Sequence, residues 1–448
     1  MVFKVSTGKI SITPPAGMNP YMAGYGAQSD VRVIDSDTPY AQPLMARCTI
    51  LWDDGYPNGI VSLDLLGIPP EVHQSLRPRL RALSSWSDAD LVLTATHTHN
   101  GPVVGRLLDP WIAYGISVLD QIDAYTSWLQ DQVVQVVKNA LAATRTSVTL
   151  DYKVATANFS ANREGLPYTE TAVPVFTAHK SGGKPAVVLF SYGCHPVSAG
   201  GQTRWDGDWP AGACAAIETA TGAFAQFLPG PAGDQNPIGL AGWSLRNQLS
   251  ASLGSIVSTA AGSAGRALTG PIYTDLTSVD LPLDITVNDA NLAAVRAAFV
   301  TRMANPQGLP AWYVRHAQSM IARIDEGDVA TSITTPLQVW QIYGDTVLPM
   351  VFVGSEIVSG YAVYFRNLYS GPGNIFVGGY ANEVDCYIPS DALLPPISVY
   401  GSYAGGWDPD FPGIAGGSMT VYPQIAHLKA SPSGVQSALI DAIAAELA

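Results

Sequence analysis

The sequence predicts an α/β fold in which helices cover a large, mixed β-sheet. Two observations predict it. Short, continuous apolar runs recur along the chain, as expected for strands that are buried on both faces. Between them lie longer segments in which apolar residues repeat at helical spacing. With 448 residues, 47% of them hydrophobic and 13% charged, the chain is long and apolar enough to bury a large core.

The expected strands are apolar runs bounded by turn residues. Residues 53–58, rich in Asp, Gly, Pro and Asn, separate the first two. Residues 90–96 and 185–192 are almost entirely apolar, which predicts strands covered on both faces. We expect strands at residues 46–52, 59–64, 90–96, 150–157, 185–192, 225–228, 272–285, 348–353 and 374–378.

The expected helices show apolar residues on one stripe. The clearest is the segment 120–141, whose stripe consists of Ile122, Tyr125, Leu129, Val133, Val136 and Ala140. The segment 289–325 is more polar but has the same spacing. We expect helices at residues 70–83, 120–141, 209–219, 243–268, 289–325 and 434–447.

The chain contains no internal repeat and no low-complexity linker, so we expect a single domain over residues 1–448. The net charge of -13 and the absence of Lys/Arg clusters argue against a nucleic-acid partner. The four cysteines form no CxxC pair and stand in apolar surroundings, which favours buried, unpaired thiols. The oligomeric state is not predictable from these patterns.

The chain has no run of eighteen apolar residues, so no transmembrane segment is expected. Its N-terminus lacks a basic stretch followed by an apolar one. These features predict a cytoplasmic protein, or a secreted one if a signal peptide has been removed.

Three histidines directly follow predicted buried strands. His97 and His99 follow the strand at 90–96, and His195 follows the strand at 185–192. In open α/β sheets, binding sites form beyond the carboxyl ends of the strands. If the first strand continues through the histidine pair, both rings point to the same face. One ring could then bind a metal and the other a substrate or water; the competing interpretation is a hydrogen-bonded surface turn.

Two histidines leave one or two positions on a hydrolytic zinc for oxygen ligands. Glu356, after an apolar strand, is one candidate, and Asp208 and Asp234 are others. For each carboxylate, a helix cap or an Asx turn is an equally good interpretation, especially for Asp208. The glycine-rich turn 230–234 could bind an anion through its N–H groups.

The sequence lacks the motifs of two common enzyme classes. There is no GxSxG nucleophile elbow, which argues against an α/β-hydrolase serine. There is also no GxxxxGK[ST] motif and no GxGxxG after a strand, so nucleotide binding is not predicted.

Taken in order, the motifs resemble the neutral/alkaline non-lysosomal ceramidases and their shorter bacterial relatives. The likeness covers nearly the whole chain. It rests on segments 12–15 (ITPP), 23–26 (AGYG), 43–47 (PLMAR), 96–102 (THTHNGP), 194–196 (CHP), 207–210 (GDWP), 233–237 (GDQNP), 380–382 (YAN), 386–390 (CYIPS) and 403–406 (YAGG).

The resemblance implies one zinc ion bound by two histidines, a glutamate and a tyrosine. It assigns these ligands to His97, His195, Glu356 and Tyr403. The family has a shorter spacing from the residue matching Asn382 to the tyrosine, which leaves Tyr400 as an alternative ligand.

The resemblance also implies two catalytic residues. Arg163, which follows Asn162, would face the carbonyl oxygen of the substrate, and His99 would lie near the zinc-bound water. We therefore expect Arg163 to stabilise an oxyanion and His99 to act as the general base. For Arg163, the competing interpretation is a solvated loop arginine paired with an acid such as Glu164.

This sequence departs from the family at two points, and these limit which of the family's properties can be expected of this chain. The family has a serine in the loop that matches residues 233–237, where this chain has Gln235 and Asn236. It also has a C-terminal immunoglobulin-like domain, which is not expected here. Both departures resemble the short bacterial relatives, so zinc-dependent hydrolysis carries over better than ceramide as the substrate.

We therefore expect a Zn²⁺-dependent hydrolase that cleaves an amide bond, N-acyl or ceramide-like, or an ester bond of a small or lipid-like substrate. An esterase or lactonase on the same scaffold is one alternative. A non-catalytic, metal-stabilised binding protein is the other, but such a protein needs neither His99 nor Arg163.

Overall fold

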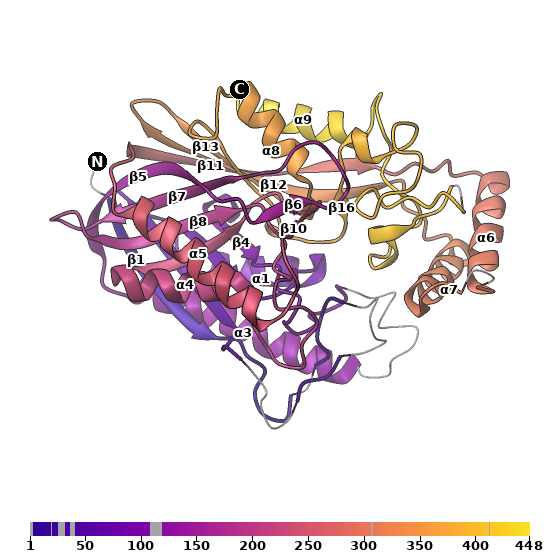
Figure 1. Cartoon of the computed structure of the whole chain (residues 1–448), viewed down its shortest axis with the longest axis horizontal. Coiled ribbons are helices and arrows are strands. Elements are labelled where there is room, and N and C mark those ends of the chain that lie inside the picture. The colour runs from indigo at the N-terminus through magenta and orange to yellow at the C-terminus, as the bar shows by residue number, and fades with distance from the viewer. Residues whose placement is uncertain are drawn as a thin grey trace.

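The structure is a computed structural model that describes residues 3–18, 20–25, 32–35, 41–107, 119–305, 308–411 and 413–448. Within these ranges, a mixed sheet of twelve strands forms the centre of the molecule (Figure 1). Helices pack on it from both sides, and the predicted α/β class is confirmed.

Nine strands of the sheet follow one another in a single path. Most neighbours are antiparallel, but β3/β4 and β13/β15 are parallel. In order across the sheet the path runs through β15 (Phe376–Gly378), β13 (Leu348–Val353), β12 (Ser332–Gly344), β11 (Arg266–Pro282), β5 (Thr146–Thr156), β1 (Phe3–Ser11), β2 (Met45–Asp53), β3 (Tyr56–Leu63) and β4 (Leu91–Ala95).

The sheet branches at β5. This strand pairs with β1 near its start and with β7 along the rest of its length. Strands β8 and β9 continue the branch as a parallel pair. The branch consists of β7 (Ala172–His179), β8 (Pro185–Tyr192) and β9 (Phe224–Pro229).

The end of the path formed by β1 to β4 packs against the branch formed by β7 to β9, and a helical layer covers the outer face of each. We call β1 to β4 the first arm. One core cluster contains Ile60 and Val92 from the first arm together with Leu189 and Leu228 from the branch. Two further clusters lie between strands and helices. The covering helices are α1 (Pro70–Arg81) and α3 (Leu119–Ala142) on the first arm, and α4 (Asp208–Thr221) and α5 (Trp243–Ala261) on the branch.

Helix α3 forms as its apolar stripe predicts. All six predicted stripe residues are buried, and each large aliphatic side chain contributes about 1.5–3 kcal/mol by leaving water. The helix lies close to β1 because Gly8 has no side chain: a Cβ there would lie 2.6 Å from the carbonyl oxygen of Val136. Glycine at this position therefore permits the close contact between strand and helix.

The C-terminal half adds a helical hairpin, two further helices and several short strands. The hairpin of α6 (Asp289–Met303) and α7 (Ala311–Glu326) stands at one end of the molecule, beside the yellow C-terminal loops (Figure 1). The elements of the whole chain not yet named are the short strands β6 (Ser160–Asn162), β10 (Gln235–Pro237), β14 (Glu356–Ile357) and β16 (Tyr387–Ile388), and the helices α8 (Ser359–Leu368) and α9 (Val435–Glu446). Short 3-10 helices lie at Asp88–Asp90, Asp391–Leu393 and Gly417–Thr420.

Two predicted helices are wrong in extent. The segment 243–268 is helical only to Ala261, and β11 begins at Arg266. Gly265 lies between them, where a Cβ would come within 2.8 Å of the carbonyl oxygen of Tyr152, so glycine allows the chain to join the sheet. The segment 289–325 is two helices: α6 ends at Met303, and Pro310 occupies the N-cap position of α7, where its missing N–H breaks no helical hydrogen bond.

The sequence pattern does not predict β1, β7, β12 or α8. Strands β7 and β12 each contain an internal proline, Pro174 and Pro336. Because proline cannot donate a backbone hydrogen bond, its presence argues against a central strand. The tertiary pairing with β5 and β11 overrides this local signal.

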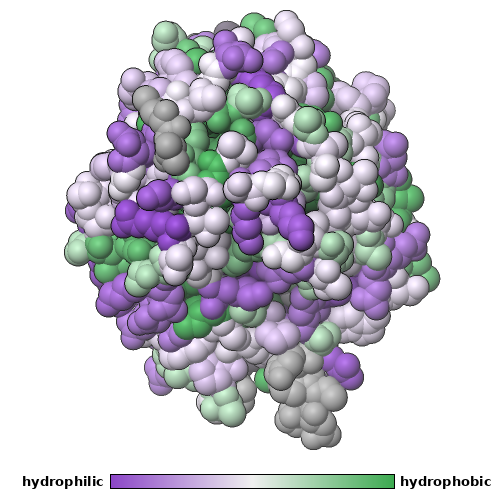
Figure 2. Space-filling view, turned by 90° about the vertical axis from the view of Figure 1, so that its left-hand side faces the viewer, coloured by the Kyte–Doolittle hydropathy of each residue, from purple (hydrophilic) through white to green (hydrophobic). Residues whose placement is uncertain are grey.

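The state of the cysteines and the distribution of hydrophobic residues are those expected from the amino-acid composition. All four cysteines are buried and unpaired, as predicted. None of the helices in the described residues combines the length and apolar composition of a membrane span. On the face shown in Figure 2, hydrophobic residues form small areas separated by hydrophilic ones, as on most globular proteins.

Candidate metal centre

Three predicted ligand residues converge from three parts of the sheet. His97 follows β4, His195 follows β8, and Glu356 opens β14, directly after β13. The Nε2 atoms of the two histidines are 3.2 Å apart. Oε2 of Glu356 lies 3.0 Å from Nε2 of His97 and 3.3 Å from Nε2 of His195. All three side chains are buried.

The hydrogen bonds of the two rings define which nitrogens face the centre. Nδ1 of His97 lies 2.7 Å from the carbonyl oxygen of Leu66, and Nδ1 of His195 lies 2.6 Å from that of Ala232. A carbonyl only accepts, so each Nδ1 carries the proton. Burial lowers the pKa of His195 to about 4, with Arg163 adding to the effect, so this ring is neutral near pH 7. Since Nδ1 carries the proton in both rings, Nε2 is the nitrogen of each ring that can present a lone pair.

The centre brings together several acceptors. The Nε2 atoms of His97 and His195 face each other at 3.2 Å, and Oε2 of Glu356 is buried with no hydrogen-bond partner among the described residues. The hydroxyl of Tyr387 can donate to Nε2 of His195 at 3.3 Å, which leaves Oε2 of Glu356 unpaired. Such an arrangement is costly unless a cation lies between the acceptors. A tetrahedral ion with ligand bonds of about 2.0–2.1 Å has ligand–ligand distances of about 3.3 Å, close to the observed spacings. The donor set thus fits zinc.

His99 reaches the same centre by a turn. Strand β4 ends at Ala95, so the strand does not continue through the histidine pair as the same-face argument assumed. His97 has φ of 67°, and the turn brings Nε2 of His99 to 3.3 Å from Nε2 of His97. The ligand atoms of His97, His99 and His195 all lie within 4.8 Å of one another.

Tyr387 contacts a histidine of the centre through its hydroxyl. Its hydroxyl lies 3.3 Å from Nε2 of His195. It occupies β16, which pairs in parallel with β14 so that Tyr387 stands opposite Glu356. Tyr403 packs edge-on against the Tyr387 ring, with centroids 5.7 Å apart, whereas Tyr400 is 92% exposed. Tyr387 lies in the motif 386–390, which supports the family resemblance, but the motif did not indicate a role for this tyrosine.

A second tyrosine that the sequence did not indicate supports the carboxylate. The hydroxyl of Tyr422 donates to Oε1 of Glu356 at 2.7 Å. Because Oε1 is occupied in this way, Oε2 is the oxygen directed at the histidines. Tyr380 packs on His97, with ring centroids 4.4 Å apart.

Arg163 lies in the site beside Tyr387. It follows β6, and its guanidinium donates to the carbonyl of Gly233 at 2.7 Å and to the hydroxyl of Tyr387 at 3.1 Å. Its neighbour Glu164 accepts hydrogen bonds from Ser402 and from the backbone of Ala404 instead. The arrangement differs from the solvated Arg163–Glu164 pair that was the competing interpretation.

The other two candidate carboxylates hold loops in place. Asp208 accepts from the backbone of Ser198 and Ala199 at 3.1 and 2.9 Å. Asp234 accepts from the backbone N–H of Ser359 at 2.7 Å and from the side chain of Asn162 at 2.8 Å. Both carboxylates thus accept from distant parts of the chain, and the N-cap residue of α4 is Gly207, not Asp208.

Two backbone N–H groups of the turn 230–234 already have backbone partners. The N–H of Gly233 donates to Ile357 at 3.0 Å, and that of Gly230 points to the carbonyl of Tyr192 at 3.4 Å. The turn contributes carbonyl oxygens instead, to His195 and Arg163.

A cavity of about 270 Å³ opens onto the metal centre. His99, Arg163, Glu356, Tyr387 and Tyr422 are among its lining residues. The cavity thus combines potential metal ligands, a cation and titratable groups, which is the usual composition of a catalytic pocket.

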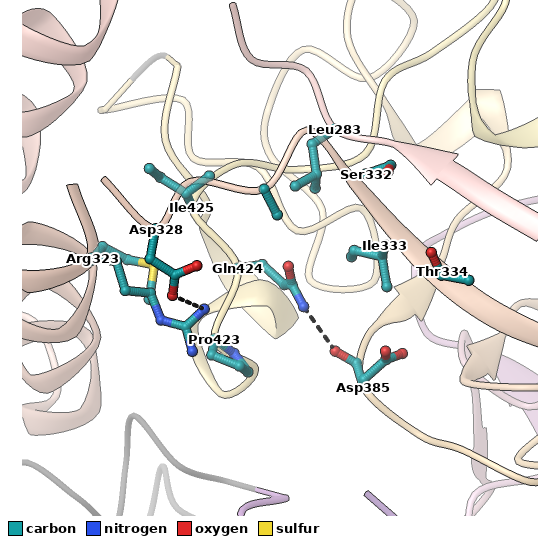
Figure 3. Close-up of a pocket in the computed structure, with 12 residues that line it drawn as sticks. Leu283, Arg323, Asp328, Ser332, Ile333, Thr334, Asp385, Pro423, Gln424 and Ile425 are labelled. Atoms are coloured by element: carbon teal, nitrogen blue, oxygen red, sulfur yellow. Dashed lines mark hydrogen bonds and ion pairs between the residues drawn. The ribbon is translucent and has the colours of Figure 1, made fainter. Parts of the chain in front are cut away.

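A second cavity of about 240 Å³ is lined by Leu283, Arg323, Asp385 and Gln424, among other residues (Figure 3). Its polar groups already have partners in the protein. Arg323 is 3.9 Å from Asp328, Ser355 donates to the carboxylate of Asp385 at 2.6 Å, and Gln424 donates to the backbone carbonyl of Asp385 at 3.2 Å. The cavity at the histidines is therefore the better candidate for the functional site.

No protein-family model matches the chain, and no curated protein matches it by sequence. Solved structures do match. The neutral ceramidase from Pseudomonas aeruginosa is 18% identical, with a TM-score of 0.66 over 94% of this chain and 72% of that one. A ceramidase complexed with C2 is 16% identical, with a TM-score of 0.66 over 94% and 73%. The chain therefore shares the fold of neutral ceramidases along nearly all of its length, as its motifs predict.

Proposed function

We propose that this protein is a zinc-dependent hydrolase that cleaves an amide or ester bond. One observation carries the proposal: the Nε2 atoms of His97 and His195 and the unpartnered Oε2 of Glu356 meet within 3.3 Å at the end of a cavity. The structural likeness to proteins described as neutral ceramidases supports hydrolysis of an N-acyl amide.

The zinc ligands in this proposal are His97, His195, Glu356 and a tyrosine. Tyr387 is the better candidate for the tyrosine, because its hydroxyl lies 3.3 Å from Nε2 of His195. Tyr403, expected from the resemblance, is the second candidate and lies one ring further out. When bound, zinc would supply Lewis acidity and a water-derived nucleophile near neutral pH.

Arg163 and His99 act on the substrate in this proposal. The Arg163 guanidinium lines the cavity and donates to the substrate carbonyl oxygen, more strongly as that oxygen gains negative charge. His99 also lines the cavity, and its Nε2 lies 3.3 Å from Nε2 of His97. In this proposal the His99 ring accepts a proton from the attacking water.

Two alternatives use the same residues differently. An esterase or lactonase needs the same ligands and oxyanion donor, and differs only in a leaving group that requires less protonation. A metal-stabilised binding protein would need the ligands alone. The presence of His99 and Arg163 on the cavity wall favours catalysis.

The test is a comparison of metal-free and zinc-loaded protein. Chelator-treated protein, reloaded to about one zinc per chain, is assayed on N-acyl amides, ceramide and aryl esters. We expect hydrolysis only after reloading, and no loss with serine-directed phosphonates. Full activity of the metal-free protein would contradict the proposal.

A further inference from the structure

Asn236 faces the cavity from β10. Its neighbour Gln235 is buried, and the side chain of Gln235 donates to the carbonyl of Gly193 in the protein interior. Successive side chains of a strand point to opposite faces, so Asn236 points the other way; it is half-buried and lines the cavity. The backbone N–H of His195 donates to the carbonyl of Gln235 at 2.9 Å, which fixes this strand beside the metal centre.

One contact defines the orientation of the Asn236 amide. Nη1 of Arg163 donates to its Oδ1 at 3.4 Å. A guanidinium only donates, so the amide oxygen is the atom that faces Arg163, and Nδ2 is directed away from it. Nη2 of Arg163 is itself held by the carbonyl of Gly233 and the hydroxyl of Tyr387. The guanidinium also lies over the Tyr403 ring, 5.0 Å from its centroid. The amide therefore has this orientation before a substrate arrives.

The Nδ2 group of Asn236 is an unused donor on the cavity wall. Among the described residues, the Asn236 side chain takes part in one hydrogen bond, the bond that its oxygen accepts from Arg163. Nη1 of Arg163 has a second hydrogen, beside the one that it donates to Asn236. The hydroxyl of Tyr25, on the same wall, already donates to the carbonyl of Val197 at 3.2 Å. Arg163 and Asn236 thus offer neighbouring N–H groups to a single acceptor.

We propose that Asn236 is a second hydrogen-bond donor to the acyl carbonyl oxygen of the substrate, beside Arg163. The inference rests on the proposed hydrolysis. Water loses a proton and adds to the acyl carbon while the π electron pair moves to the carbonyl oxygen. The pair returns as the bond to nitrogen or oxygen breaks, and the leaving atom takes a proton. Nδ2 donates most strongly while the oxygen is negative, so Asn236 stabilises the transition state more than the bound substrate.

Two substitutions separate donation to the substrate from orientation of Arg163. Asn236→Asp keeps an oxygen for Arg163 but has no N–H, and Asn236→Leu has neither group. We expect each to lower kcat on anilides and aryl esters about a hundredfold, with little change in KM or zinc content. Asn139→Asp, at an exposed position of α3, is the control for the added charge and is expected to keep the wild-type rate.

The pattern of the two variants decides the role of Asn236. A loss with Asn236→Leu alone would make Asn236 a residue that only positions Arg163, because the Asp variant still accepts from the guanidinium. A loss with Asn236→Asp alone would be an effect of its charge. Either pattern, wild-type kcat in both variants, or loss of zinc from either of them would overturn the proposal.

Binding of methylphosphonate tests the donor without turnover. This anion is tetrahedral and carries negatively charged oxygens, as the acyl group does during the reaction. Calorimetry on the full-length, zinc-loaded protein measures its affinity. Asn236→Leu is expected to weaken binding about tenfold or more, the effect of one hydrogen bond to a charged group. Equal affinity of the variant and the wild type, or no binding to the wild type, would contradict the assigned role.

The two measurements distinguish failure of this inference from failure of the proposed function. Zinc-dependent hydrolysis that is unchanged in Asn236→Leu would refute the donor and leave the hydrolase intact. Methylphosphonate affinity that depends on Asn236, without turnover of any amide or ester, would refute the hydrolase and leave the donor intact.

Discussion

The hydroxyl of Tyr422 donates to Oε1 of Glu356 at 2.7 Å, and the other oxygen of the same carboxylate faces His97 and His195 at 3.0 and 3.3 Å. One phenol thereby orients a carboxylate between two imidazoles. Such outer partners of metal ligands keep the ligands in place and affect how tightly the metal is held.

Tyr422→Phe is expected to weaken zinc binding about tenfold or more, because Glu356 then loses the bond that orients it. Competition with a chromophoric chelator measures the affinity. Tyr364→Phe, at a 42% exposed position in α8, serves as the control. Equal zinc affinity of the two variants would refute the orienting role.

Substitution of the three histidines is expected to separate ligands from catalyst. His97→Ala and His195→Ala should lose both zinc and activity, because their Nε2 atoms form the centre with Glu356. His99→Ala should keep zinc and lose activity. Metal analysis of each purified variant beside its rate is the measurement, and loss of zinc from the His99 variant would make His99 a ligand.

Substitution of the two candidate tyrosines is expected to give unequal results. Tyr387→Phe should lower zinc affinity more than Tyr403→Phe, since only the Tyr387 hydroxyl is within 3.3 Å of a centre histidine among the described contacts. The same chelator competition measures both. The reverse order would return the ligand role to Tyr403.

Arg163→Ala is expected to lower kcat about a hundredfold, or about 3 kcal/mol of transition-state stabilisation, through loss of one oxyanion donor. Arg163→Lys should recover little, because an ammonium lacks the planar fork in which Nη2 donates to Gly233 and Tyr387 while Nη1 donates to Asn236 at 3.4 Å. Zinc content and Tm should stay close to wild type in Arg163→Lys. Wild-type kcat/KM in the alanine variant would remove Arg163 from catalysis.

His316 is expected to make the fold sensitive to acid. Burial, aided by Arg302, lowers its pKa from 6.5 to about 3 in the folded chain. Between these pH values the unfolded chain binds a proton that the folded one does not, so stability falls as the pH drops below 6.5, by up to about 1.4 kcal/mol per pH unit. Denaturant unfolding of wild type and His316→Gln at pH 7 and pH 5 tests this: the variant should lose less stability.

The sequence alone determined the fold class and the two strand-end histidines. Apolar runs such as residues 90–96 and 185–192 predict buried strands because burial on both faces excludes polar side chains. The histidines that follow these runs are local features of the chain, so their place at the strand ends was predictable. The motif resemblance selected Glu356 from the three candidate carboxylates and added Arg163, and the structure brings both into the same cavity.

Only the tertiary structure decided which other residues meet these side chains. Tyr387 reaches His195 because β16 pairs with β14, and Tyr422 reaches Glu356 from a loop that α7 supports. These contacts join positions far apart in the chain. Local spacing and propensity describe neighbours along the sequence, whereas such contacts depend on how the whole core packs, so no local pattern contains them.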